Sequence, residues 1–207
     1  MKKSERFFTV LCSLVILLTT LYALLHFFTS GGQGNMTVTG AQCFRYFTVD
    51  SNLLMAAVSV PVLCCALRGR PFSPVLRVLR YLSASAVTLT MMTVLAFLGP
   101  IMGYRAMFAG PNLYMHLTTP LLAVFLQIFT DNRTRMAKGT VLFSLIPTAI
   151  YGAVYILQVL IRRVWPDFYS FASGGLWYVS LIAMFLGTLL LGWALWVLRK
   201  AAGKTRT

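Results

Sequence analysis

Four polar side chains gather where one long apolar segment of the chain begins. Thr48, Asp50, Ser51 and Asn52 fall close together in the run from Cys43 to Leu54. Polar and ionisable groups are costly inside a membrane-spanning segment, so a cluster of them there indicates function. The same residue types are also good helix N-caps, so a helix start is the competing interpretation.

Helical periodicity divides this cluster between two faces. At about 3.6 residues per turn, one face of a helix contains the following residues: Thr48, Ser51, Asn52, Met55 and Ser59. Asp50 points away from that face, toward a different neighbour. We expect Asp50 to pair with Arg45 or with another arginine at the same end of the bundle, which would keep it ionised.

A second polar face lies on a later apolar segment and carries one of the two histidines. Its members are spaced at helical intervals: Asn112, His116, Thr119 and Gln127. A buried histidine must find a partner or lose its charge, which favours a functional role for His116. Counted along the two helices, Thr48 and His116 both fall in the outer half of the membrane, about a turn and a half apart. Tilt of the helices would close that gap.

A hydroxyl and an imidazole are the minimum set for acyl transfer. The imidazole of His116 would take the proton of the Thr48 hydroxyl, the oxygen would attack an ester carbonyl, and the imidazolium would release the alcohol. The oxyanion needs a hydrogen-bond donor, and either Asn52 or Asn112 is spaced to supply it. Asp50 would orient His116 only if the segment near it is not a regular helix.

The elements that must position these residues are long apolar segments. The chain has 207 residues, of which 58% are hydrophobic and 11% charged, whereas a soluble domain carries about a quarter charged residues. About 20 helical residues cross a hydrocarbon core of about 30 Å. We therefore predict an all-α, six-transmembrane-helix bundle that forms one domain over 1–207, with spans near 7–28, 44–67, 75–98, 112–129, 139–161 and 176–198.

The eighteen cations are distributed unequally between the two sides of these spans. Four arginines fall on the outer side, and the other fourteen cations, which include Arg77, Arg80 and Arg199, fall on the side of the termini. This bias predicts that the N and C termini are both cytoplasmic. The net charge of +14 therefore sets topology, and we expect no nucleic-acid partner.

Other features add a second wall and few further chemistries. Tyr151 and Tyr155 share a face of the fifth span, which indicates a cavity wall, although a proline-kinked packing face explains them equally well. Together with Ser51, Met55 and Thr119 they are our candidates for a substrate cavity. The aromatic run from Trp165 to Phe171 is typical of an interfacial belt or of a lid. We expect no metal and no cofactor, and the cysteines contain no C-x-x-C spacing.

Two stretches carry a resemblance to a known family. The run from Phe44 to Leu54, with Y-F-T-x-x-S-N, and the run from Asn112 to Pro120, with H-x-x-x-P, resemble the bacterial six-span proteins of the Pr-six-Pr type. Those proteins are similar to the androgen-induced and androgen-dependent TFPI-regulating proteins. The resemblance implies an integral protein of the bacterial plasma membrane. Asp50 departs from the family, in which an uncharged residue is expected.

The animal proteins of this family are intramembrane threonine hydrolases of fatty acid esters of hydroxy fatty acids. By resemblance, Thr48 would be the nucleophile, His116 its base, and a lipid of the bilayer the substrate. Two alternatives stay open. A transporter or channel would line a path with the same polar faces, although the sequence has few acids and no repeated halves. A non-catalytic membrane protein would bind lipid or a partner subunit.

Overall fold

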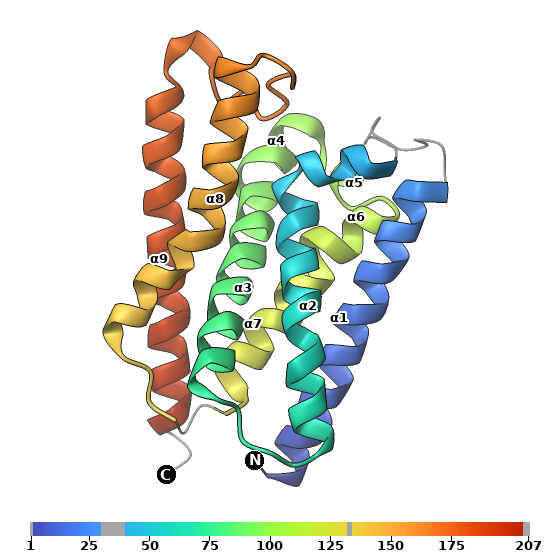
Figure 1. Cartoon of the computed structure of the whole chain (residues 1–207), viewed down its shortest axis with the longest axis vertical. Coiled ribbons are helices and arrows are strands. Elements are labelled where there is room, and N and C mark those ends of the chain that lie inside the picture. Colours follow the sequence, from blue (N-terminus) through green and yellow to red (C-terminus); the bar gives the residue numbers. More distant parts are fainter. Residues whose placement is uncertain (1, 30–39, 132–133, 205–207) are drawn as a thin grey trace.

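The computed structural model describes residues 2–29, 40–131 and 134–204, and these parts contain helices and no strand (Figure 1). Six helices are long and apolar enough to cross a membrane, which confirms the all-α six-span bundle and an integral membrane protein. Each overlaps one predicted span: Lys3–Thr29, Phe47–Leu67, Pro74–Met102, Pro111–Phe129, Lys138–Ile161 and Trp177–Gly203.

Several spans are built from more than one helical segment. The first three spans comprise α1 (Lys3–Thr29), α2 (Phe47–Leu67, preceded by the 3₁₀ turn η1, Gly40–Arg45) and α3 (Pro74–Thr93, continued by the π turn η2, Val94–Leu98, and α4, Gly99–Met102). The short α5 (Tyr104–Met107) leads into the fourth span, which comprises α6 (Pro111–Leu113), the π turn η3 (Tyr114–Thr118) and α7 (Thr119–Phe129). The last two comprise η4 (Lys138–Ser144), α8 (Leu145–Ile156) and the π turn η5 (Leu157–Ile161), then η6 (Ser173–Gly175) and α9 (Trp177–Lys204).

Both ends of the chain lie at the same end of the bundle (Figure 1). We refer to it as the inner end, because the cation bias assigns it to the cytoplasm. Of the inner cations, Arg133 and Arg206 lie outside the described residues.

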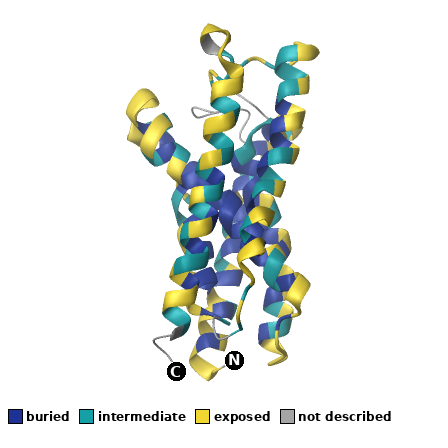
Figure 2. Ribbon diagram, turned by 90° about the vertical axis from the view of Figure 1, so that its left-hand side faces the viewer, coloured by how far each residue is buried: buried dark blue, intermediate teal, exposed yellow. Residues whose placement is uncertain are grey.

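The buried residues lie along the middle of the bundle, where α1, α2, α3 and α7 pack together (Figure 2). The helices α8 and α9 lie side by side at one flank (Figure 1). Large apolar side chains of α9, such as Ile182, Leu186 and Leu190, are exposed. An apolar outer surface is expected where lipid is the solvent.

The third span continues past the predicted end at Gly99-Pro100. The π turn η2 shifts the hydrogen-bond register, so that the Gly99 amide donates to the Val94 carbonyl and Pro100 falls in the first turn of α4. Proline is tolerated there because a first-turn N–H has no helical partner to lose. The helix ends instead at Gly103, whose φ of 89° favours glycine.

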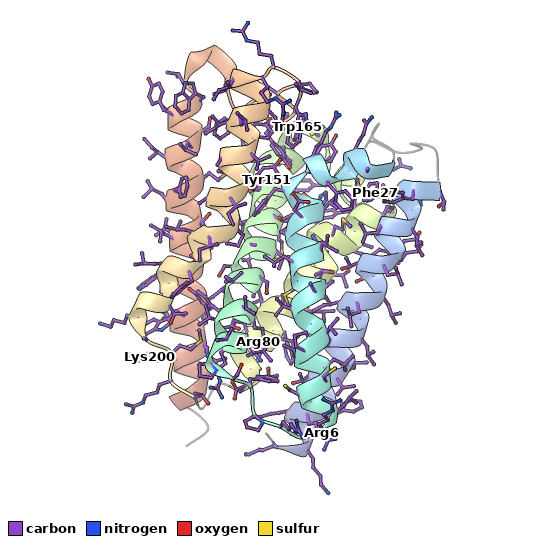
Figure 3. All side chains as sticks on the ribbon, viewed as in Figure 1. Arg6, Phe27, Arg80, Tyr151, Trp165 and Lys200 are labelled. Carbon is purple, nitrogen blue, oxygen red and sulfur yellow. The ribbon has the colours of Figure 1, made fainter. Side chains whose placement is uncertain are left out.

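Two inner arginines are buried in the bundle, contrary to their interpretation as exposed topogenic flanks. The Arg80 guanidinium donates to the carbonyl oxygens of Leu126 and Thr130 at 3.2 and 2.9 Å (Figure 3). Arg199 donates to the carbonyls of Gln127, Thr130 and Asp131. These groups close the C-terminal end of α7, where unpaired carbonyls and the helix dipole attract cations.

Candidate functional site

Thr48 lies in the first turn of α2, and its side chain is 7% exposed. Its backbone carbonyl accepts hydrogen bonds from Ser51 Oγ at 3.1 Å and from Asn52 Nδ2 at 2.8 Å. Its hydroxyl makes no hydrogen bond within the part of the chain that the structure describes. The hydroxyl of Thr48 is therefore free to react, whereas the backbone around it is fixed.

Asn52 joins α2 to the π turn η3. Besides the Thr48 carbonyl, its Nδ2 donates to the Met115 carbonyl at 3.0 Å. Both amide hydrogens are therefore used, and the buried Oδ1 has no partner among the described residues. In this conformation the Asn52 amide holds two backbone segments together and has no hydrogen left for an oxyanion.

His116 lies on η3, next to Met115, and is 2% exposed. Its Nδ1 lies 2.7 Å from the Met107 carbonyl oxygen. Because a carbonyl can only accept, Nδ1 carries the proton and Nε2 keeps its lone pair, which is the form that a general base needs. No hydrogen bond connects His116 with Thr48 in the described chain. The structure thus connects their segments through Asn52 and leaves the two side chains unjoined.

The other polar candidates of the fourth span lie on its buried face, as the periodicity predicted. Asn112 is buried in α6. The Thr119 hydroxyl lies 3.4 Å from that of Thr19 in α1. Thr119 therefore connects α7 with α1, away from the Thr48 side chain.

Asp50 points away from the face of Thr48, as predicted, toward a small cavity of about 230 Å³ between α2 and α8. Its predicted partner is not found: no ion pair includes Asp50 among the described residues. The Arg45 guanidinium lies instead over the Trp165 ring, 5.9 Å from its centroid. An aromatic face thus takes the cation that the carboxylate was expected to hold.

A larger cavity of about 570 Å³ opens beside Thr48, between α3 with η2 on one side and α8 with α9 on the other. Tyr151 and Tyr155 line it, as expected of a cavity wall. Ser51 instead bonds the Thr90 hydroxyl at 3.0 Å, and Met55 packs in the core beside Ser83. The remaining lining is almost wholly apolar, and no charged residue belongs to it.

The outer loop closes the outer end of this cavity. The Asp167 carboxylate accepts from the Tyr155 hydroxyl at 2.8 Å and from the amides of Phe171 and Ala172 at 2.8 and 2.7 Å. The Tyr169 hydroxyl accepts from the Phe47 amide at 3.2 Å, and Figure 3 shows Tyr151 and Trp165 at this end of the bundle. Burial raises the pKa of Tyr169 well above its usual range, so its phenol stays neutral at this contact.

The cavity was not predicted from the sequence, although small residues mark its walls. Ala96 and Ala183, with Gly152 and Gly187, line it from η2, α8 and α9. Small residues at helical spacing usually indicate close packing, and only the divergence of α3 from α9 turns them into free space. No cluster of three or more metal-ligating side chains occurs in the described residues. Comparison with family models, curated proteins and solved structures found no match to this chain.

Proposed function

We propose that this protein is an intramembrane hydrolase of lipid esters, with Thr48 as the nucleophile and His116 as the general base. One observation carries the proposal. The Thr48 side chain lines a large apolar cavity, and its hydroxyl takes part in no hydrogen bond of the described chain. Such a hydroxyl meets the acyl part of a lipid in a place from which bulk water is largely excluded.

The proposed reaction runs in two stages. Thr48 Oγ1 attacks the ester carbonyl carbon while its proton passes to Nε2 of His116. Collapse of the tetrahedral intermediate breaks the ester C–O bond, and the imidazolium protonates the departing alcohol. Water then attacks the acyl-threonine with the same base, which releases the fatty acid and restores Thr48.

The proton must travel between two side chains that lie on either side of Asn52. The proposal places one water between Thr48 Oγ1 and His116 Nε2, a distance that general-base catalysis tolerates. The bond of His116 Nδ1 to the Met107 carbonyl supports this role, because it fixes both the ring orientation and the tautomer.

The lining of the cavity favours an uncharged substrate. It offers apolar surface and a few hydroxyls but no cation for a free carboxylate. An ester whose two arms are both aliphatic fits this lining, and the fatty acid esters of hydroxy fatty acids implied by the family resemblance belong to this class.

A fluorophosphonate probe applied to membranes containing the full chain tests the proposal. We expect covalent labelling of the wild type, no labelling of Thr48→Ala, and weak labelling of His116→Ala. Thr93→Ala is the matched control, because Thr93 also lines the cavity through a hydroxyl with no hydrogen bond in the described chain. Labelling of Thr48→Ala at the wild-type level would remove Thr48 as the nucleophile.

Lipid binding without catalysis is the second candidate. The observation that favours it is the lack of a hydrogen bond between Thr48 and His116 among the described residues. It predicts that esters bind equally to the wild type and to Thr48→Ala, and that neither protein cleaves them. A transporter would instead show flux in liposomes that survives substitution of both residues.

A further inference from the structure

The cavity beside Thr48 has a definite inner floor, where α9 meets α3. The Tyr81 hydroxyl donates to the Gly192 carbonyl at 2.6 Å. A Cβ on Gly192 would lie 2.6 Å from Ser144 Oγ and 3.0 Å from the Tyr81 hydroxyl. Only glycine permits this approach of α9 to its neighbours, so the floor is closed.

The space opens again at Gly187, five residues before Gly192 and about 7.5 Å along the helix. A Cβ on Gly187 would meet no atom within 4 Å, and the residue lines the cavity. The two glycines of α9 therefore have opposite surroundings. One lets the helices touch, and the other leaves the cavity wall without a side chain.

The cavity opens through the side of the bundle. Met92 and Phe97 on the α3 side are exposed, and so are Ala183 and Leu190 on α9, and all four line the cavity. These residues lie within helices long enough to span a membrane. The mouth between η2 and α9 therefore faces the hydrocarbon of the bilayer, not water.

The size of this space suits one aliphatic chain. Its α9 wall runs from Ser180 to Leu191, about 16 Å along the helix. Its volume of about 570 Å³ is that of a typical small-molecule site. The absence of charge from the lining excludes a polar head group from the interior.

We propose that the cavity binds a single acyl chain that enters from the bilayer between η2 and α9, and that Gly187 is the specificity-determining residue. The ester group lies at Thr48, and the tail runs along α9 toward the floor at Tyr81 and Gly192. The inference rests on the proposed function for the identity of the ligand as an ester, whereas chain binding is measured separately from cleavage.

A photoreactive ester tests the site in the purified full chain. The probe is a fatty acyl ester with a diazirine near the methyl end of its chain, cross-linked in lipid nanodiscs and mapped by mass spectrometry. We expect cross-links on α9 between Gly187 and Leu191 that excess unlabelled ester suppresses. Gly187→Leu fills the wall and should reduce this labelling about tenfold, the equivalent of 1.4 kcal/mol of binding.

Gly139→Leu is the matched control, because a Cβ on Gly139 also meets nothing within 4 Å and Gly139 lies outside the cavity. It should label like the wild type. Leucine favours a helix more than glycine, so loss of labelling in Gly187→Leu does not arise from a weaker helix. Equal labelling of Gly187→Leu and wild type would overturn the inference, as would cross-links spread over the lipid-facing side of α1.

Cleavage assays on the same proteins separate the two proposals. If α9 is labelled but the wild type cleaves no ester, hydrolysis at Thr48 is refuted and the acyl-chain site is supported. If cleavage depends on Thr48 but is unchanged in Gly187→Leu for esters of every chain length, the acyl-chain site is refuted and the hydrolase stands.

Discussion

Asn52 donates a 3.0 Å hydrogen bond to the backbone carbonyl of Met115, and this bond fastens the start of α2 to the π turn that carries His116. The π turns η2 and η3 share a second property: each is followed at once by a helical segment with proline in its first turn. The wider turn adjusts the hydrogen-bond register ahead of the proline, which lacks an amide hydrogen. The local backbone that holds His116 is thus a consequence of Pro120 as well as of the histidine.

Replacement of Asn52 by leucine should separate the two segments. The Met115 carbonyl loses its bond from Nδ2, and we expect a loss of stability of about 1 kcal/mol, as for other hydrogen bonds between membrane helices. Hydrolysis should fall more steeply than stability, because His116 loses its fixed position relative to Thr48. Thermal unfolding in detergent and ester cleavage by the same sample measure the two effects. Unchanged cleavage would show that Asn52 has no positioning role.

Arg80→Met should be strongly destabilising. Arg80 closes the end of α7 through hydrogen bonds to Leu126 and Thr130, and loss of charged hydrogen bonds of this kind costs about 3 kcal/mol in total. Arg80→Lys should recover only part of the loss, because lysine has no planar fork of donors. Unfolding by heat measures both variants. Arg70→Met, at an exposed arginine, is the control and should change stability by less than about 0.5 kcal/mol.

Alanine at the two glycines of α9 should act in opposite directions. Gly192→Ala forces a Cβ against Ser144 and Tyr81, and overpacking of this kind costs about 1–3 kcal/mol. Gly187→Ala meets no neighbour and should stabilise the helix by up to about 1 kcal/mol. Melting temperatures of the two variants decide the point. A shift of the same sign in both would contradict the contrast between the closed floor and the open wall.

Asp167→Asn should loosen the outer loop without unfolding the bundle. The asparagine keeps an acceptor for Tyr155, but its amide group meets the Ala172 N–H, which needs an acceptor. We expect faster hydrogen–deuterium exchange at Phe171 and Ala172, with no change at α3. Exchange that is as slow as in the wild type would mean that the carboxylate does not hold the loop.

Cys43 should make the protein sensitive to alkaline pH. The thiol is fully buried, and burial raises its pKa in the folded state. A raised folded pKa contributes stability below the pKa of the unfolded thiol, and this contribution is lost as the pH rises through the folded pKa. Cys43→Ala should therefore lose less stability between neutral and alkaline pH than the wild type does. Denaturant unfolding across that pH range, with Cys64→Ala as the control, measures the difference.

Much of the fold follows from hydrophobic pattern and helical phase. The spans and the buried face of Thr48, Ser51 and Asn52 were predictable, because a 3.6-residue period fixes which side chains share a side. The burial of Arg80 was not, since cation counting cannot show that the end of α7 lies beside it. One signal was available: Arg80 lies five residues inside the predicted third span.

The rest of the site depends on tertiary geometry. The angle at which α9 leaves α3 creates the cavity, and nothing in the spacing of Gly187 and Gly192 distinguishes open space from contact. Hydrogen-bond direction is equally hidden. The sequence suggested Asn52 as a donor to an oxyanion, whereas its amide hydrogens are held by two carbonyls that only the folded chain brings within reach.

The lateral mouth between η2 and α9 also determines how affinity has to be expressed. A ligand that arrives through the hydrocarbon is never at a bulk aqueous concentration, because it partitions into the membrane first. Saturation then depends on its mole fraction among the surrounding lipids and on two-dimensional diffusion. Adding inert phospholipid at constant amounts of enzyme and ester should therefore slow turnover by surface dilution, whereas adding buffer should not.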